Sequence, residues 1–66
     1  MSDLLPISLE AQIACIEREL DMRAKVYPRL VAKKQMAAPK ADYEISAMTA
    51  VLKTLRTVQQ QIEEDR

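Results

Sequence analysis

The chain contains no glycine, no histidine and no tryptophan, and its only cysteine is Cys15. Glycine is the usual residue for positive φ in hairpin turns and helix caps, so its absence argues against a compact β-protein and favours helices joined by simple loops. The absence of histidine removes the commonest metal ligand and the commonest general base. A lone cysteine excludes a disulfide within the chain and suits a reducing compartment. We therefore expect no metal, no cofactor and no enzymatic activity.

The chain is short, with 66 residues. It allows a single domain, residues 1–66, and a domain of this size buries only about 60% of the surface of its unfolded chain. Without disulfides or a metal, self-association is the expected way to complete the core. Residues 1–6 lack the basic and long apolar regions of a secretory signal, and no apolar run approaches the ~20 residues of a transmembrane helix. We expect a cytoplasmic protein with no membrane partner.

Apolar side chains recur at intervals of three, four and seven residues, which predicts an amphipathic helix over about residues 8–34, with Ser8 as its N-cap. The stripe consists of Leu9, Ile13, Ile16, Leu20, Tyr27 and Leu30. Arg23 occupies the one core position of this stripe that is not apolar. Pro28 removes a hydrogen bond and clashes with the carbonyl of Ala24, so we expect a kink near Pro28, or a helix that ends near Tyr27 and resumes.

A second helix is predicted over about residues 39–63, because proline suits the first helical position and Pro39 precedes another apolar stripe. That stripe consists of Ile45, Met48, Leu52, Leu55, Gln59 and Ile62. A short connection at residues 34–38 makes the helices antiparallel neighbours. The predicted fold class is all-α, an antiparallel αα-hairpin. A turn at these residues would set Arg23 near Leu52 and Tyr27 beside Met48.

Each helix also carries a second, partial apolar stripe. The first helix has Ala11, Cys15, Met22 and Val26, and the second has Val51 and Val58. Two helices alone bury one seam, so a second stripe requires a further neighbour. We therefore predict that hairpins assemble into a homo-oligomeric bundle of four or more helices.

The net charge is zero, but the middle of the chain is basic: residues 22–40 carry six basic residues and no acidic one. Arginine grips phosphate oxygens in a bidentate manner, and a tyrosine ring stacks on a nucleobase. Helical spacing brings Arg23, Tyr27 and Lys34 to one face. The predicted ligand-binding residues are Arg23, Tyr27, Arg29, Lys33 and Lys34.

Other interpretations of the basic segment stay open. The stem of Arg23 could pack while its guanidinium reaches water, or Arg23 could pair with Glu19 or Asp21 of another copy. The cluster could also be a solvated surface around a packed Tyr27. A compact phosphorylated ligand fits better than a nucleic acid, since acidic flanks and zero net charge oppose affinity for a long polyanion.

The run LEAQIACIERELDMRAKVYPRLVAKKQM, followed by KADYEISAMTAVLKTL, resembles short uncharacterised proteins of bacteriophage and prophage genomes. The resemblance covers Leu9 to Leu55, and its most distinctive piece is MRAKVYPRLV, Met22 to Val31. It implies a viral origin and a bacterial host cytoplasm. Phages also encode small helical oligomers, similar in architecture, that sequester cyclic nucleotide signals of host immunity, although architecture alone does not imply function.

Two functions follow as hypotheses. The leading one is a non-enzymatic, phage-type homo-oligomer that sequesters a small anionic ligand, a cyclic nucleotide immune signal, and so antagonises host defence. The alternative is a small phage protein that inhibits or adapts a host protein through exposed apolar helix faces. A plain structural or nucleic-acid-associated oligomer is a third interpretation.

Overall fold

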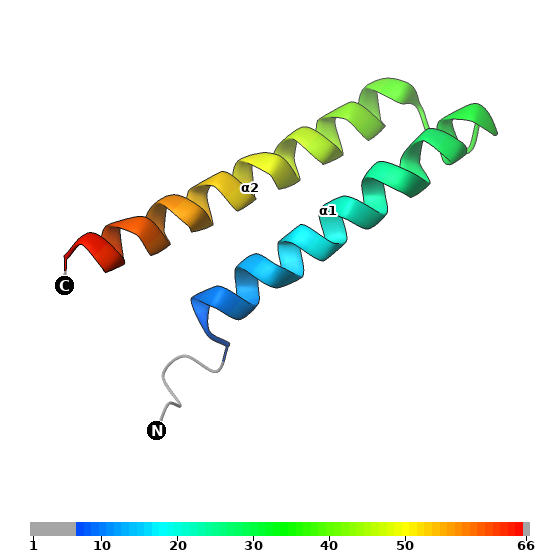
Figure 1. Cartoon of the computed structure of the whole chain (residues 1–66). Helices are drawn as coiled ribbons and strands as arrows, with labels where there is room; N and C mark the ends of the chain where they lie inside the picture. The colour runs from blue at the N-terminus through cyan, green and yellow to red at the C-terminus, as the bar shows by residue number, and fades with distance from the viewer. Residues whose placement is uncertain (1–6, 66) are drawn as a thin grey trace.

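The computed structural model describes residues 7–65. Two helices, α1 (Leu9–Ala32) and α2 (Ala38–Glu64), run antiparallel and pack against each other, with the start of α1 and the end of α2 at the same end of the hairpin (Figure 1). The predicted all-α hairpin is confirmed, and residues 7–65 contain no strand. Neither described helix has the length and apolar character needed to cross a membrane. The expectations about residues 1–6 lie outside the described residues.

The start of α1 has the predicted cap. The Ser8 hydroxyl accepts a hydrogen bond from the backbone N–H of Ala11 at 3.0 Å, which satisfies a donor left unpaired at the helix end. Glu10 in the first turn complements the positive end of the helix dipole. Downstream, α1 continues through Pro28 as one helix, so it does not end near Tyr27 and resume. The kink near Pro28 stays a prediction.

The end of α1 is built around Lys34, which has a positive φ of 62°. The N–H of Gln35 donates to the carbonyl of Leu30 at 2.8 Å, and the N–H of Lys34 donates to the carbonyl of Val31 at 3.0 Å. This pair of bonds is a Schellman motif, in which glycine usually takes the left-handed position. Since the chain has no glycine, a lysine occupies that position. The motif ends α1 at Ala32, two residues before the predicted boundary.

The start of α2 lacks a side-chain cap. Its N-cap is Ala37, and Pro39 lies in the first turn, where its missing N–H costs no helical bond. The earlier end of α1 moves the centre of the turn back along the chain, so the register differs from the predicted one. Arg23 meets Glu44, whereas the sequence spacing set it near Leu52.

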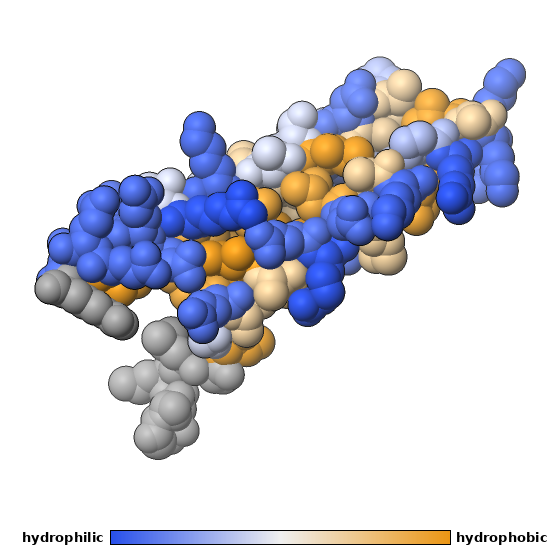
Figure 2. Space-filling view, in the orientation of Figure 1, coloured by the Kyte–Doolittle hydropathy of each residue, from blue (hydrophilic) through white to orange (hydrophobic). Residues whose placement is uncertain are grey.

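The core of the hairpin is a narrow seam between α1 and α2. Its buried residues are Ile13, Ala41 and Leu52, and none is wholly buried. The other residues of the two predicted stripes lie half-buried along the seam, apart from Ile62, which is exposed. The radius of gyration is 15.3 Å, against about 11 Å for a compact domain of this length. Figure 2 shows apolar surface along the hairpin between groups of charged side chains.

Candidate functional site

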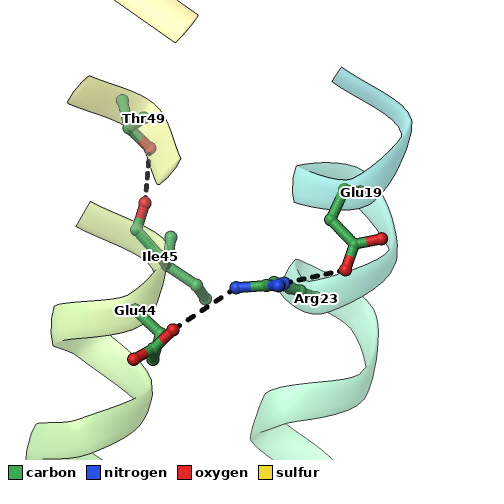
Figure 3. A network of polar contacts seen from close by, with 5 residues as sticks. All are labelled: Glu19, Arg23, Glu44, Ile45 and Thr49. Carbon is green, nitrogen blue, oxygen red and sulfur yellow. Dashed lines mark hydrogen bonds and ion pairs between the residues drawn. The ribbon is translucent and has the colours of Figure 1, made fainter. Parts of the chain in front are cut away.

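Arg23 reaches across the seam and meets two carboxylates (Figure 3). Its Nε donates to Oε1 of Glu19 at 3.0 Å, and its Nη1 donates to Oε1 of Glu44 at 3.4 Å. The side chain of Arg23 is 25% exposed, and both glutamate side chains are 35% exposed. The positive charge is therefore compensated inside the hairpin, and an anionic ligand would have to compete with both carboxylates.

Tyr27 is the second neighbour of Arg23. The guanidinium carbon lies 5.8 Å from the centre of the Tyr27 ring, within the range of a cation–π contact. The hydrogen bond to Glu19 raises the pKa of Arg23, while desolvation opposes that rise. Arg23 therefore stays charged at every physiological pH. The sequence suggested Glu19 of another copy as a possible partner of Arg23. In the structure, the Glu19 that pairs with Arg23 belongs to the same helix.

Glu44 was not predicted as a partner of Arg23. It lies on α2, 21 residues away in sequence, so only the register of the two helices brings it to Arg23. A signal was available in the sequence, because a half-buried arginine requires an acid, a carbonyl or an anion. Choosing Glu44 required knowing that α1 ends at Ala32.

Tyr27 also lines an open groove of about 290 Å³ on one side of the hairpin, near the turn. The other lining residues are Pro28, Val31, Ala38, Ala41, Asp42 and Ile45. The charged member of this set is an acid, Asp42, and none of the predicted cations lines the groove. A phosphate would meet repulsion here, which leaves the Tyr27 groove suited to apolar groups.

The three remaining predicted residues lie at the turn. Arg29 is in the last turn of α1, Lys33 is its C-cap and Lys34 is the left-handed residue of the Schellman motif. All three are exposed. Within residues 7–65, none of them forms a salt bridge, in contrast to Arg23, Lys25 and Arg56, which pair with acids. These cations are available to an external anion.

The structure thus divides the predicted site in two. Arg23 and Tyr27 lie together at the seam, whereas Arg29, Lys33 and Lys34 lie at the turn. Ten residues of helix separate Arg23 from Lys33, which corresponds to about 15 Å. Tyr27 and Lys34 accordingly line different grooves.

The partial stripes predicted from the sequence lie on one side of the hairpin, where Glu19 and Glu44 interrupt them, seven residues before Val26 and Val51 respectively. A groove of about 290 Å³ is lined by Ile7, Ala11, Gln12, Cys15, Ile16, Val51 and Leu55, so the partial stripes of α1 and α2 lie on the same side. Helical spacing adds Met22 and Val26 to the α1 part and Val58 to the α2 part. We define the apolar face as Ile7, Ala11, Cys15, Met22, Val26, Val51 and Val58. The sequence predicted both stripes but not that they share one side.

Ion pairs mark the opposite side of the hairpin. Arg56 of α2 pairs with Glu17 of α1 there, and on the outer surface of α1 Lys25 pairs with Asp21 at 3.2 Å. The groove beside Tyr27 opens on this same side, next to Asp42. Ion pairs therefore occur on both sides: Arg56 pairs with Glu17 on this side, and Arg23 pairs with Glu19 and Glu44 on the side that carries the apolar face.

Residues 7–65 contain no group of three or more histidine, cysteine or acidic side chains that could hold a metal ion. Comparison with protein-family models, with curated proteins and with solved structures found no match to this chain. The resemblance to phage proteins therefore rests on the sequence runs alone, and function has to be argued from the surface of the hairpin.

Proposed function

We propose that the chain is a non-enzymatic interaction module whose apolar face binds another helical surface. The observation that carries this proposal is the incomplete core: among residues 7–65, the buried apolar residues are limited to Ile13, Ala41 and Leu52, while Met22 is 51% and Val51 is 44% exposed. Exposed apolar surface of this extent, bordered by polar residues, marks interaction sites in soluble proteins.

The energetics support the same proposal. Burying apolar surface contributes about 25 cal/mol per Å², and two helices joined by one seam bury little of it. A third and fourth helix packed on the apolar face would cover Met22, Val26, Val51 and Val58 together. The hairpin is one layer of helices thick, whereas stable domains are built from two packed layers.

Cys15 offers a direct test, because it is exposed in the isolated hairpin and belongs to the apolar face. If a partner covers this face, maleimide should label Cys15 at least about tenfold more slowly in a fresh extract of producing cells than in urea-unfolded protein. Val51→Lys, a substitution in the same groove, should restore fast labelling. The matched control is Ser46→Lys, at an exposed residue of α2 outside the apolar face.

Fast labelling of the unmodified protein in extract, equal to that of Val51→Lys, would contradict the proposal. Circular dichroism should show equal helix content in both variants, so that a change in labelling reports on the face and not on the fold.

A second candidate is capture of a small anionic ligand by the turn. Four cations support it: Arg29, Lys33, Lys34 and Lys40 are exposed, and no ion pair involves them within residues 7–65. Charge-assisted hydrogen bonds from such groups suit phosphate oxygens. In this form, the ligand contacts fall to Arg29, Lys33 and Lys34. Arg23 contributes only if an acid releases it, and Tyr27 stacks only if assembly brings it to the turn of another copy.

Isothermal titration tests this candidate with cyclic di- and trinucleotides and with cyclic ADP-ribose isomers, the class of host immune signal that such a phage protein would sequester in the host cytoplasm. Lys33→Gln should lower the affinity at least about tenfold, in line with the loss of one charged hydrogen bond. Lys53→Gln, at an exposed lysine of α2 away from the turn, should change little. No heat with any of these ligands at micromolar protein removes the candidate.

A further inference from the structure

The charged residues of the hairpin are sorted by end. Near the turn lie four basic residues, Arg29, Lys33, Lys34 and Lys40, and one acidic residue, Asp42. At the open end, the first turn of α1 and the last residues of α2 carry the acidic residues Glu10, Glu63, Glu64 and Asp65. The sequence shows only a basic middle with acidic flanks. Folding into a hairpin brings the start of α1 and the end of α2 to one end and the turn to the other (Figure 1), so one end is acidic and the other is basic.

Some of these charges continue the apolar face itself. Arg29 lies seven residues after Met22, and Lys33 lies seven residues after Val26, so both extend the α1 stripe toward the turn. On α2, Lys40 lies eleven residues before Val51, and Asp65 lies seven residues after Val58. The apolar face therefore has basic residues at the turn and acidic residues at the open end, with the carboxylates of Glu19 and Glu44 held by Arg23 between them.

We propose that the apolar face docks on the same face of a second copy of this chain, with the two hairpins antiparallel. This inference rests on the proposed function and names the partner. An isologous two-fold contact requires a self-complementary surface, and a surface basic at one end and acidic at the other is self-complementary only when the copies run in opposite directions. A parallel pair would set base on base and acid on acid.

The antiparallel arrangement with aligned helix ends sets a register. The two-fold axis lies in the interface and crosses the helices at right angles, so α1 of one copy lies on α1 of the other. With the helix ends aligned, Cys15 and Val26 are equally far from the middle of α1, which runs from Leu9 to Ala32. Cys15 of one copy therefore faces Val26 of the other. The two Cys15 residues lie about 16 Å apart along the axis, beyond the reach of a disulfide.

Sedimentation equilibrium of the full chain tests the assembly and its electrostatics together. We expect a monomer–dimer equilibrium whose dissociation constant rises about three- to tenfold between roughly 0.05 and 0.5 M salt, because opposite charges at the borders are screened. Lys33→Gln combined with Lys40→Gln should weaken the dimer by a similar factor. In a parallel dimer, both changes would remove repulsion and tighten association.

Cross-linking tests the orientation. Under mild oxidation, Val26→Cys with the native Cys15 should form disulfide-linked dimers, whereas the unmodified chain and Val26→Cys combined with Cys15→Ser should not. Efficient linking of the unmodified chain through Cys15 alone would overturn the antiparallel arrangement. Val51→Lys should abolish the dimer, and the Ser46→Lys control should retain it with the same helix content.

The two proposals fail in different ways. If the chain stays monomeric at roughly 200 μM while Cys15 is still protected in cell extract, the partner is not a second copy. The proposed interaction module then remains, with a different protein bound to its apolar face. A monomeric chain whose Cys15 is reactive in extract overturns both.

Discussion

At the residue scale, two positions decide what the basic segment does. Lys34 was predicted as a ligand for phosphate, but its backbone has a structural role, because the Schellman motif needs a left-handed residue there. Arg23 was predicted to interrupt the apolar stripe for a ligand. The interruption is real, and Glu19 and Glu44 account for it inside the hairpin. Neither residue needs an external ligand to explain its position.

Lys34→Gly should increase the free energy of unfolding by about 1 kcal/mol, because a non-glycine residue in the left-handed region costs about 1–2 kcal/mol and glycine recovers most of that. Urea denaturation monitored by circular dichroism measures the change. Lys33→Gly is the matched control, since Lys33 has a φ of −86° and gains nothing from glycine. Equal effects of the two substitutions would contradict this assignment.

Arg23→Met should lower the melting temperature, because it leaves Glu19 and Glu44 facing each other without a cation. The loss should shrink in 1 M salt, where the repulsion between the carboxylates is screened. Because the pKa of Arg23 is raised above its already high usual value, its charge is present throughout pH 6 to 9, and the loss in melting temperature should not depend on arginine titration in that range. Lys25→Met is the control, since its pair with Asp21 is exposed and contributes little.

At the element scale, α1 contains a destabilising proline and α2 begins without a side-chain cap. Pro28 removes one helical hydrogen bond from α1, yet the helix continues to Ala32 because packing along the seam holds both halves. In α2, Ala37 offers no side-chain acceptor to the first turn. Two threonines of α2 also donate to carbonyls of the preceding turn: Thr49 to Ile45 at 2.8 Å (Figure 3) and Thr57 to Lys53 at 2.9 Å.

Pro28→Ala should stabilise the hairpin by about 1–3 kcal/mol. Alanine restores the hydrogen bond to the carbonyl of Ala24 and removes the steric clash, and this gain exceeds the ~0.4–1 kcal/mol lost through a more flexible unfolded chain. Thermal denaturation measures the difference, with Ala32→Ser at the exposed end of α1 as the control. A destabilised Pro28→Ala variant would show that the groove beside Tyr27 requires the proline ring.

At the scale of the whole molecule, the hairpin is a single layer with one apolar face and two oppositely charged ends. These features exist only after α1 and α2 pair. The two partial stripes come to one side, and the basic middle of the chain becomes one end of a rod. Self-association would convert the single layer into a two-layer bundle with a core typical of stable domains.

The melting temperature of the full chain should therefore depend on its concentration. Mass action predicts a rise of about 3–6 °C for each tenfold increase in protein, because unfolding of a dimer releases two chains. Differential scanning calorimetry at several concentrations measures this rise. A melting temperature that stays constant over a hundredfold range would show that the hairpin is stable as a monomer.

The sequence by itself determined the helices and their inner faces. Local rules of helical periodicity and turn chemistry were enough to predict the hairpin and most of its seam. They were applied to the spacing of Leu9, Ile13, Ile45 and Leu52 and to the absence of glycine. It also predicted which residue types are unusual, Arg23 and Pro28 among them, because each breaks a local rule.

Only the tertiary structure decided what those residues contact. The pairing of Arg23 with Glu44 depends on the register, which the Schellman motif at Lys34 sets by ending α1 at Ala32. That Cys15 and Val51 line one groove depends on how two helices are rotated against each other, which the pattern of either helix alone does not contain. Contacts between residues distant in sequence are a property of the packed pair, so the charged ends and the apolar face could be recognised only after folding.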